Sequence, residues 1–269
     1  MSCRLTLCIA FICCLMGTSS RAELTVIEDA EGQQGLTVFR MTVTPAAEPV
    51  PALKHRLTLR PHELKPGNAA TYYLRAYAEN GLGGTWKSVR EEFGEVVDEG
   101  WYSNKIPLSE LPLDQVRKAS SQFDDLVSMF IAPASSRRGC DWGYNLTELR
   151  GTEVFALMLP GVQQSRSISR MLALRTRLAI AESRYADAID HMRMNYRLAR
   201  NVGQEPILVC GLVGLAEARV TGETVLDLIT APDSPNLYWA LSELPRPLVD
   251  MRAAIRMEMS NATRIFPAL

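Results

Sequence analysis

Two of the six cysteines, Cys140 and Cys210, lie beyond the first 22 residues. In an oxidising compartment, two such thiols can form a disulfide, which would join the segment around Cys140 to a later helix. They can also stay apart, because free cysteine often behaves as a small buried apolar residue. The sequence therefore gives a candidate disulfide and leaves both outcomes open.

A catalytic thiolate is a third interpretation of Cys140. The segment Gly139-Cys140-Asp141-Trp142 is similar to the nucleophile segment of papain-type proteases. Those enzymes carry a glutamine six residues before the cysteine, and this chain has Ala134 there. Because part of the signature is missing, we predict no catalytic residue.

The three histidines do not form a metal-binding pattern. A zinc site needs three or four converging ligands. His55 and His62 are an odd number of residues apart, so on one strand they would face opposite sides. His191 lies beside an apolar helical stripe and is expected to be solvated. Paired acids such as Asp124 and Asp125 are typical of exposed helices, so the sequence predicts no metal and no cofactor.

Aromatic residues lie at the ends of several predicted elements and are the candidate binding residues. Aromatic side chains with a polar tip are favoured where an apolar face meets water or a partner. The alternative is that they cover the helical core beneath the loops. The candidates are Trp86, Trp101, Trp142, Tyr238 and Trp239.

The N-terminus has the pattern of a cleavable signal peptide, residues 1–22. Arg4 supplies the positive charge, an apolar stretch runs from Leu5 to Met16, and the small residues Ser20 and Ala22 precede the cleavage site. The apolar stretch is too short to span roughly 30 Å of hydrocarbon. We therefore predict an exported protein, periplasmic or extracellular, that begins at Glu23.

Removal of this leader takes away two arginines and no acid, and leaves 247 residues with a net charge of −3. This length is enough for one large domain or two small ones. A near-neutral chain predicts no nucleic-acid partner, because phosphate binding needs a concentrated basic face. No later segment is apolar enough to predict a transmembrane span.

The pattern of the chain changes near residue 65. Residues 23–65 are β-rich: Glu23 to Ile27 and Leu36 to Thr44 predict a hairpin, and Arg56 to Arg60 a third short strand. Residues 66–269 predict an α-helical domain, with a polar loop at 132–145 between its two parts. The predicted helices are 69–79, which Asn68 caps and Gly81, Gly83 and Gly84 end, and 86–97, 112–131, 148–158, 163–183, 185–201, 206–229, 235–244 and 247–266.

Two of these helices predict an antiparallel hairpin that turns at Ser183-Arg184. The turn and the start of the second helix resemble a tetratricopeptide repeat at Tyr185, Ala188 and Ile189, but no second copy follows at the repeat's period. We therefore predict a mainly α fold, built of antiparallel helical hairpins in a solenoid-like layer, with a small β-hairpin segment at the N-terminus.

Four segments, in this order, resemble landmarks of an uncharacterised family of exported planctomycetal proteins. They are Pro51-Ala-Leu-Lys-His-Arg-Leu57, Pro66-Gly-Asn-Ala-Ala70, Cys140-Asp-Trp-Gly143 and Pro235-Asn-Leu-Tyr-Trp-Ala-Leu241. The resemblance covers most of the mature chain and implies no activity.

The C-terminal helix carries an apolar stripe almost to the end of the chain. Its residues are Leu248, Met251, Ile255, Met259, Ala262 and Phe266. Either this helix folds back on the helix predicted at 206–229, or its stripe stays partly exposed because a further helix is missing or is supplied by a partner. We favour the second alternative, in which the stripe supports self-association.

These patterns favour an exported, non-enzymatic helical protein that binds a macromolecule, either a protein or an envelope polymer, or acts as a scaffold. The alternative is a cell-envelope hydrolase acting on polymer or peptide, with Asp141 and Trp142 in its cleft. A deep pocket that gathers acids, histidine and aromatics would favour the enzyme. An open groove without perturbed acids would favour the binding protein.

Overall fold

The computed structural model describes residues 22–27, 38–43, 51, 54–78, 81–94, 97, 100–144 and 160–265. Three predictions lie outside these residues: the signal peptide, the helix at 148–158 and the end of the apolar stripe at Phe266.

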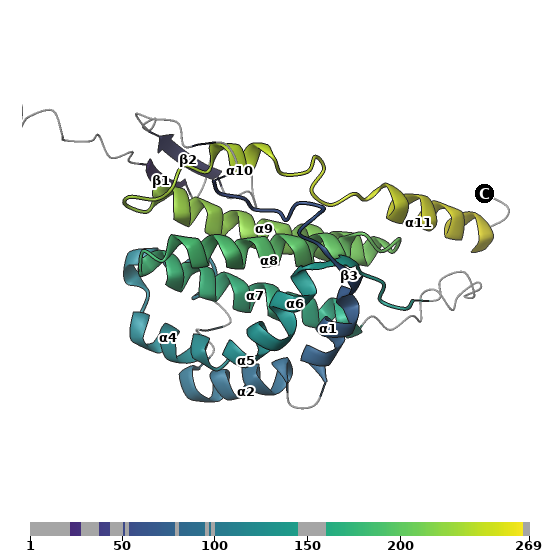
Figure 1. Cartoon of the computed structure of the whole chain (residues 1–269), viewed down its shortest axis with the longest axis horizontal. Helices are drawn as coiled ribbons and strands as arrows, with labels where there is room; N and C mark the ends of the chain where they lie inside the picture. Colours follow the sequence, from purple (N-terminus) through teal and green to yellow (C-terminus); the bar gives the residue numbers. More distant parts are fainter. Residues whose placement is uncertain are drawn as a thin grey trace, which may run out of the picture.

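Three long helices form the central layer of the molecule (Figure 1). They are α7 (Pro160–Ala181), α8 (Tyr185–Gly203) and α9 (Leu208–Thr230). The connection between α7 and α8 is short, and Ser183 turns the chain with a positive φ of 57°. Short connections make consecutive helices antiparallel, so the predicted hairpin at Ser183-Arg184 is confirmed.

Helix α9 approaches α8 closely at Gly214. A Cβ atom there would lie 2.6 Å from the carbonyl oxygen of Ala199 and 2.8 Å from the Cα atom of Gly203. Because those are backbone atoms, only a residue without a side chain allows this spacing between the two helices.

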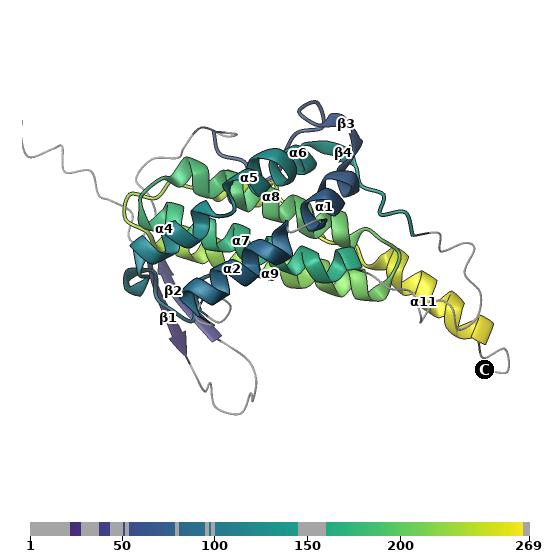
Figure 2. The ribbon, with the colours of Figure 1, turned by 90° about the horizontal axis from the view of Figure 1, so that it is seen from below.

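A second layer of shorter helices covers α7 and α8 (Figure 2). It consists of α1 (Ala69–Tyr77), α2 (Leu82–Phe93), the 3₁₀ turn η1 (Leu108–Glu110), α4 (Leu113–Ser121), α5 (Asp124–Leu126), the π-helical η2 (Val127–Ile131) and α6 (Ala132–Ser135). The mainly α, layered fold that the sequence predicts is therefore confirmed.

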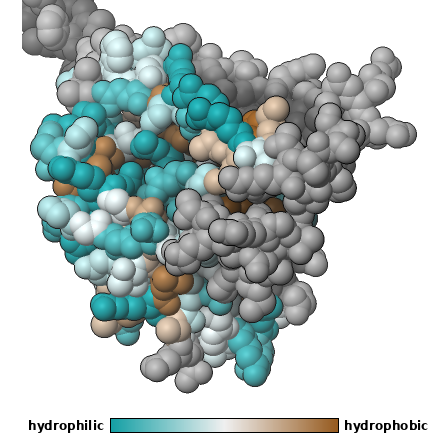
Figure 3. Space-filling model, turned by 90° about the vertical axis from the view of Figure 1, so that its right-hand side faces the viewer, coloured by the Kyte–Doolittle hydropathy of each residue, from teal (hydrophilic) through white to brown (hydrophobic). Residues whose placement is uncertain are grey.

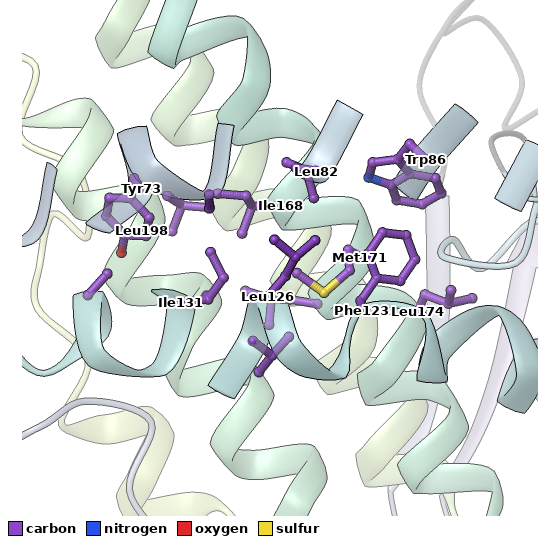
Figure 4. Packing of buried hydrophobic residues seen from close by; sticks show 14 of the residues in the cluster. Tyr73, Leu82, Trp86, Phe123, Leu126, Ile131, Ile168, Met171, Leu174 and Leu198 are labelled. Atoms are coloured by element: carbon purple, nitrogen blue, oxygen red, sulfur yellow. The ribbon is translucent and has the colours of Figure 1, made fainter. Parts of the chain in front are cut away.

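The main core lies between these two layers (Figure 4). The Trp86 ring of α2 lies 5.0 Å from the Phe123 ring, which is at the end of α4, and both face α7 residues such as Met171. A second core packs Leu57 and α10 (Tyr238–Ser242) against Ile189 and Met192 of α8 and Leu228 of α9. Segments that are distant in the sequence therefore share both cores.

Strands are short. The predicted hairpin is confirmed as β1 (Ala22–Ile27) paired antiparallel with β2 (Val38–Val43). A second pair was not predicted: β3 (Lys65–Asn68) runs parallel to β4 (Arg137–Gly139), inside the segment expected to be a polar loop. The amide of Lys65 donates to the carbonyl of Ser136 at 2.8 Å. These two backbone groups therefore bond to each other and not to water.

Several predicted boundaries are wrong. Arg56 to Arg60 is not a strand, because Leu57 is buried between helices and the carbonyl of Arg56 accepts from the side chain of Arg193. Helix α2 begins at Leu82, so Gly83 and Gly84 lie inside it and do not end α1.

The predicted helix at 112–131 breaks near Phe123, whose backbone leaves helical geometry with ψ of 2°. The predicted helix at 235–244 is shorter, and the helix predicted from Pro247 begins only at Arg252. Asp250 caps that start, since its carboxylate accepts from the amide of Arg252 at 3.0 Å.

This last helix, α11 (Arg252–Ile265), extends beyond the ends of α8 and α9 (Figures 1 and 2). Its base is held where Met251 and Ala254 pack on Gly211 of α9. Ile255 is 47% exposed and Met259 is 66% exposed, so the stripe is partly exposed as predicted. Within the residues that the structure describes, no helix is both long and apolar enough to cross a membrane.

Candidate functional site

Three of the five candidate aromatics belong to the core. Trp86, Trp101 and Trp142 are all buried, so of the two interpretations given for the aromatics, these three fit the one in which they cover the helical core. Trp86 donates to the carbonyl of Ser167 and Trp142 to that of Asn201, which satisfies both indole N–H groups inside the protein. Their polar tips meet backbone acceptors rather than water.

The other two candidates are on the surface. Tyr238 is 64% exposed and Trp239 is 45% exposed, both on α10. Their rings meet edge to face, with centroids 5.0 Å apart. This pair keeps the exposure that a binding surface needs, but it lines none of the hollows described below.

The two thiols are free, so the candidate disulfide is not formed in the structure. Burial, with Glu205 nearby, raises the pKa of Cys140 and of Cys210 to about 12. A thiol with such a pKa is a poor nucleophile near neutral pH. Asp141 beside Cys140 shapes a turn, because its carboxylate accepts from the amide of Gly143 at 2.9 Å.

His191 is not solvated as predicted. It is half-buried between α7 and α8, and burial together with the charge of Arg175 lowers its pKa to about 4. The side chain of Arg175 donates to its Nε2 atom at 3.4 Å. In the described ranges, His, Cys, Asp and Glu side chains nowhere gather in threes as metal ligands would.

A surface hollow with many basic residues in its lining follows α8. Three adjoining hollows share lining residues, and we call them together the arginine groove. Arg193, Arg197 and Arg200 recur every three or four residues, so they lie on one face of α8. The first hollow lies beside Lys54, the second beside Leu64 and the third beside Arg256. Arg193 lines both the first and the second hollow, and Arg197 and Arg200 line both the second and the third.

The opposite wall of the groove is the irregular segment 54–64. Arg193 fixes this segment, because its guanidinium donates twice to the carbonyl of Arg56, at 3.1 and 3.0 Å. The adjacent Leu57 is buried in the second core and anchors it from beneath. At the other end, the third hollow continues between α8 and the base of α11, where Arg256 lines it.

Positive charge dominates the groove, with seven basic residues and two acids in its lining. The basic residues are Lys54, Arg56, Arg60, Arg193, Arg197, Arg200 and Arg256, and the acids are Glu63 and Asp250. Hydrogen bonds from Arg60 hold the pKa of Glu63 at about 2, and those from Arg252 do the same for Asp250. Both acids therefore stay ionised and do not act as proton donors near neutral pH.

The guanidinium of Arg200 differs from those of Arg193 and Arg197, because it has no partner within the part of the chain that the structure describes. Arg197 donates to the carbonyls of Arg137 and Arg138, and Arg193 pairs with Asp190. The side chain of Arg200 makes no hydrogen bond or ion pair with any residue that the structure describes, although it lines two of the hollows. Its five N–H donors are available to an anion.

The groove combines an open shape with an acid-poor lining. From the first hollow to the third, the volumes are about 220, 160 and 290 Å³. They are lined by neither histidine, cysteine nor aromatic residues, and Thr58 supplies the hydroxyl group. The arrangement suits binding of negative charge, because guanidinium groups donate to carboxylates and phosphates without exchanging protons.

Sequence reasoning missed this site. The spacing of Arg193, Arg197 and Arg200 was a signal that could have indicated a basic helix face. The second wall had no such signal, since Arg56 and Arg60 precede α8 by more than a hundred residues.

Three buried or half-buried acids with raised pKa values, Glu205, Glu217 and Asp227, lie outside the lining of the groove. Glu217 of α9 is buried, and neither of its carboxylate oxygens has a hydrogen-bond partner. Burial raises its pKa to about 8, against smaller opposing effects of Ser165 and Arg166. It lines none of the three hollows of the groove, so nothing places it against a substrate.

Comparison with protein-family models, with curated proteins and with solved structures gave no match.

Proposed function

We propose that this chain is an exported, non-enzymatic binding protein that holds a negatively charged macromolecule in the arginine groove. The observation that carries the proposal is Arg200, an unpartnered guanidinium in an open groove of arginines. A buried or half-buried charge without a counter-charge costs free energy, so an anionic partner would stabilise it.

The lining of the groove favours this function over the hydrolase alternative. Hydrolysis would need a nucleophile or a general acid with a pKa near the working pH. The acids of the groove have pKa values near 2, and the thiols outside it have values near 12. The hydrolase alternative placed Asp141 and Trp142 in a cleft. In the structure the Asp141 carboxylate stabilises a turn, and Trp142 is buried in the core.

The groove also refines the expectation about charge. A near-neutral chain can still concentrate positive charge locally, and α8 does so with arginines spaced along one face. The described surface at the end where α11 projects is mainly hydrophilic, with hydrophobic residues in separate small groups (Figure 3). Charge is therefore a better basis for recognition there than a broad apolar face.

Binding of fluorescent poly-L-glutamate and of dextran sulfate tests the proposal. Arg200→Glu should weaken binding of both polymers at least tenfold, because it reverses an unpartnered charge in the groove. The matched control is Arg219→Glu on α9, since Arg219 is exposed and outside the groove. Absence of binding, or an equal loss with the control variant, would contradict the proposal.

Export is tested separately. Intact-mass measurement of the chain recovered from the cell envelope or medium should give a protein that begins at Glu23. A mass that retains residues 1–22 would contradict the cleaved leader.

A further inference from the structure

The middle hollow of the arginine groove has two walls of different chemistry. One wall consists of Arg193, Arg197 and Arg200 of α8, and the other includes Leu59, Pro61 and Leu64. These three apolar residues are half-buried or exposed, so their outer surfaces are accessible. A ligand that fills this hollow must therefore offer negative charge on one side and aliphatic surface on the other.

Three charges along α8 suit an extended chain. Arg200 is seven positions after Arg193, which is a rise of roughly 10 Å along a helix. An extended peptide advances about 3.3 Å per residue and points alternate side chains in opposite directions. A peptide of about four residues would therefore match the row of arginines, with every second side chain directed to each wall.

The positive charges of α8 favour such a ligand. Burial and the nearby charge of Arg200 lower the pKa of Arg197, so the two guanidinium groups repel one another. A carboxylate between them would offset that repulsion, and guanidinium groups bind carboxylates with two parallel hydrogen bonds.

We propose that the partner of the arginine groove is a polypeptide segment in which acidic and aliphatic residues alternate, bound in an extended conformation. The acidic side chains contact Arg200 and Arg197, and the aliphatic side chains pack on Leu59 and Leu64. This inference rests on the proposed function and names the class of its partner.

Other polyanions fit the two walls less well. Single-stranded nucleic acids gain affinity by stacking bases on aromatic side chains, and none lines the described hollows of the groove. An acidic polysaccharide would turn hydroxyl groups toward the aliphatic wall, where burial without hydrogen bonds is unfavourable. A peptide with alternating acidic and aliphatic side chains can contact the arginines of one wall and the apolar residues of the other.

Fluorescence anisotropy with three labelled peptides tests this inference on the mature chain. The peptides are an alternating Glu-Leu octamer, an alternating Glu-Ser octamer of equal charge, and an alternating Lys-Leu octamer. We expect the Glu-Leu peptide to bind at least tenfold more tightly than the Glu-Ser peptide, and the Lys-Leu peptide not to bind. Dextran sulfate and an oligothymidylate serve as competitors.

Two variants separate the walls. Arg200→Glu should weaken the Glu-Leu peptide at least tenfold, whereas Leu64→Ser should remove the preference for Glu-Leu over Glu-Ser. Matched controls are Arg219→Glu for charge and Val209→Ser for an exposed apolar residue on α9. Leu59→Ala repeats the second test if Leu64→Ser lowers the melting temperature.

The outcomes distinguish the inference from the proposed function. Equal affinity for the Glu-Leu and Glu-Ser peptides would overturn the inference and leave anion binding intact. Binding of dextran sulfate or the oligonucleotide at Arg200, without binding of the Glu-Leu peptide, would do the same. Failure of every anionic probe, or equal sensitivity to Arg219→Glu, would overturn both.

Discussion

The burial of single polar side chains affects the free energy of unfolding of this protein, and Glu217 is one such side chain. Its carboxyl group lies among buried residues, with no hydrogen-bond partner for either oxygen. The neutral form is therefore favoured, and the pKa rises to about 8 from a usual value near 4.5. At neutral pH the folded chain keeps a proton that the unfolded chain releases.

This difference predicts a pH dependence of stability. Below about pH 4.5 both states hold the proton, and between pH 4.5 and 8 only the folded state does, so the free energy of unfolding falls as pH rises. A shift of this size corresponds to a fall on the order of 5 kcal/mol. Urea unfolding of the natural chain and of Glu217→Gln, from pH 4 to 9, measures it.

The comparison between the two proteins isolates Glu217. His191 acts in the opposite direction at low pH, because its folded pKa is lowered to about 4. Subtracting the variant's profile removes such contributions. The difference should grow across pH 4.5 to 8 in favour of the glutamine variant. A flat difference would mean that Glu217 is solvated.

Arg177 is the second such residue, and it joins the two layers. Its guanidinium is fully buried, pairs with Asp227 of α9 at 2.8 Å, and donates to four backbone carbonyls. The four carbonyls belong to Gly100, Trp101, Ser103 and Ile106. One side chain of α7 therefore holds a loop that has no regular secondary structure.

Arg177→Met should lower the free energy of unfolding by about 3–5 kcal/mol, because it leaves Asp227 buried without its counter-charge. Arg219→Met, at an exposed ion pair with Glu223, should change it little. Denaturant titration of both variants gives the comparison. Equal losses of stability in the two variants would mean that the buried ion pair of Arg177 and Asp227 matters no more than an exposed one.

At the scale of elements, the long helices could be predicted and their partners could not. Apolar residues at helical spacing mark α7, α8 and α9, and the predicted ends agree within a few residues. That periodicity is a local property of the chain. It identifies an element and its buried face, but not which distant segment covers that face.

The missed features all depend on such distant segments. Strand β4 exists because Lys65 bonds to Ser136, and no apolar alternation marks either strand. The sequence left a surface role and a core role open for Trp86 and Trp142, and only the fold decides between them, since their N–H groups find backbone acceptors in α7 and α8. The arginine groove needed both α8 and segment 54–64, so only the fold could assemble it.

The contact between α8 and α9 gives a test at this scale. Gly214→Ala should destabilise the protein by roughly 1–3 kcal/mol, because the new Cβ would meet backbone atoms of α8. The matched control is Gly222→Ala in the same helix, where nothing lies within 4 Å of the added atom. That change should stabilise by about 0.5–1 kcal/mol. Thermal unfolding of both variants should give shifts of opposite sign.

At the scale of the whole molecule, α11 projects from the packed layers (Figure 1). Its base contacts α9 through Met251 and Ala254, and the following turns extend away from the layers (Figure 1). Ile255 and Met259 share one face of that extension and are both exposed. An amphipathic helix in this position is not held by burial of its own apolar face.

We predict that this face supports self-association, so the double substitution Ile255→Ser and Met259→Ser should weaken it. In sedimentation velocity, the double variant should shift toward the monomer at concentrations where the natural chain associates. The melting temperature of the monomer should stay nearly unchanged, because both side chains are already in solvent. A natural chain that remains monomeric at high concentration would contradict the prediction.

A control at the base of the same helix shows what ordinary core would do. Ala254 is buried against Gly211 of α9, so Ala254→Leu should displace α11 and lower the melting temperature. If the double serine variant also lowers it by a similar amount, the apolar face of α11 is covered within the monomer, and the association surface must lie elsewhere. If only Ala254→Leu does, the free end of α11 is left for a second copy of the chain.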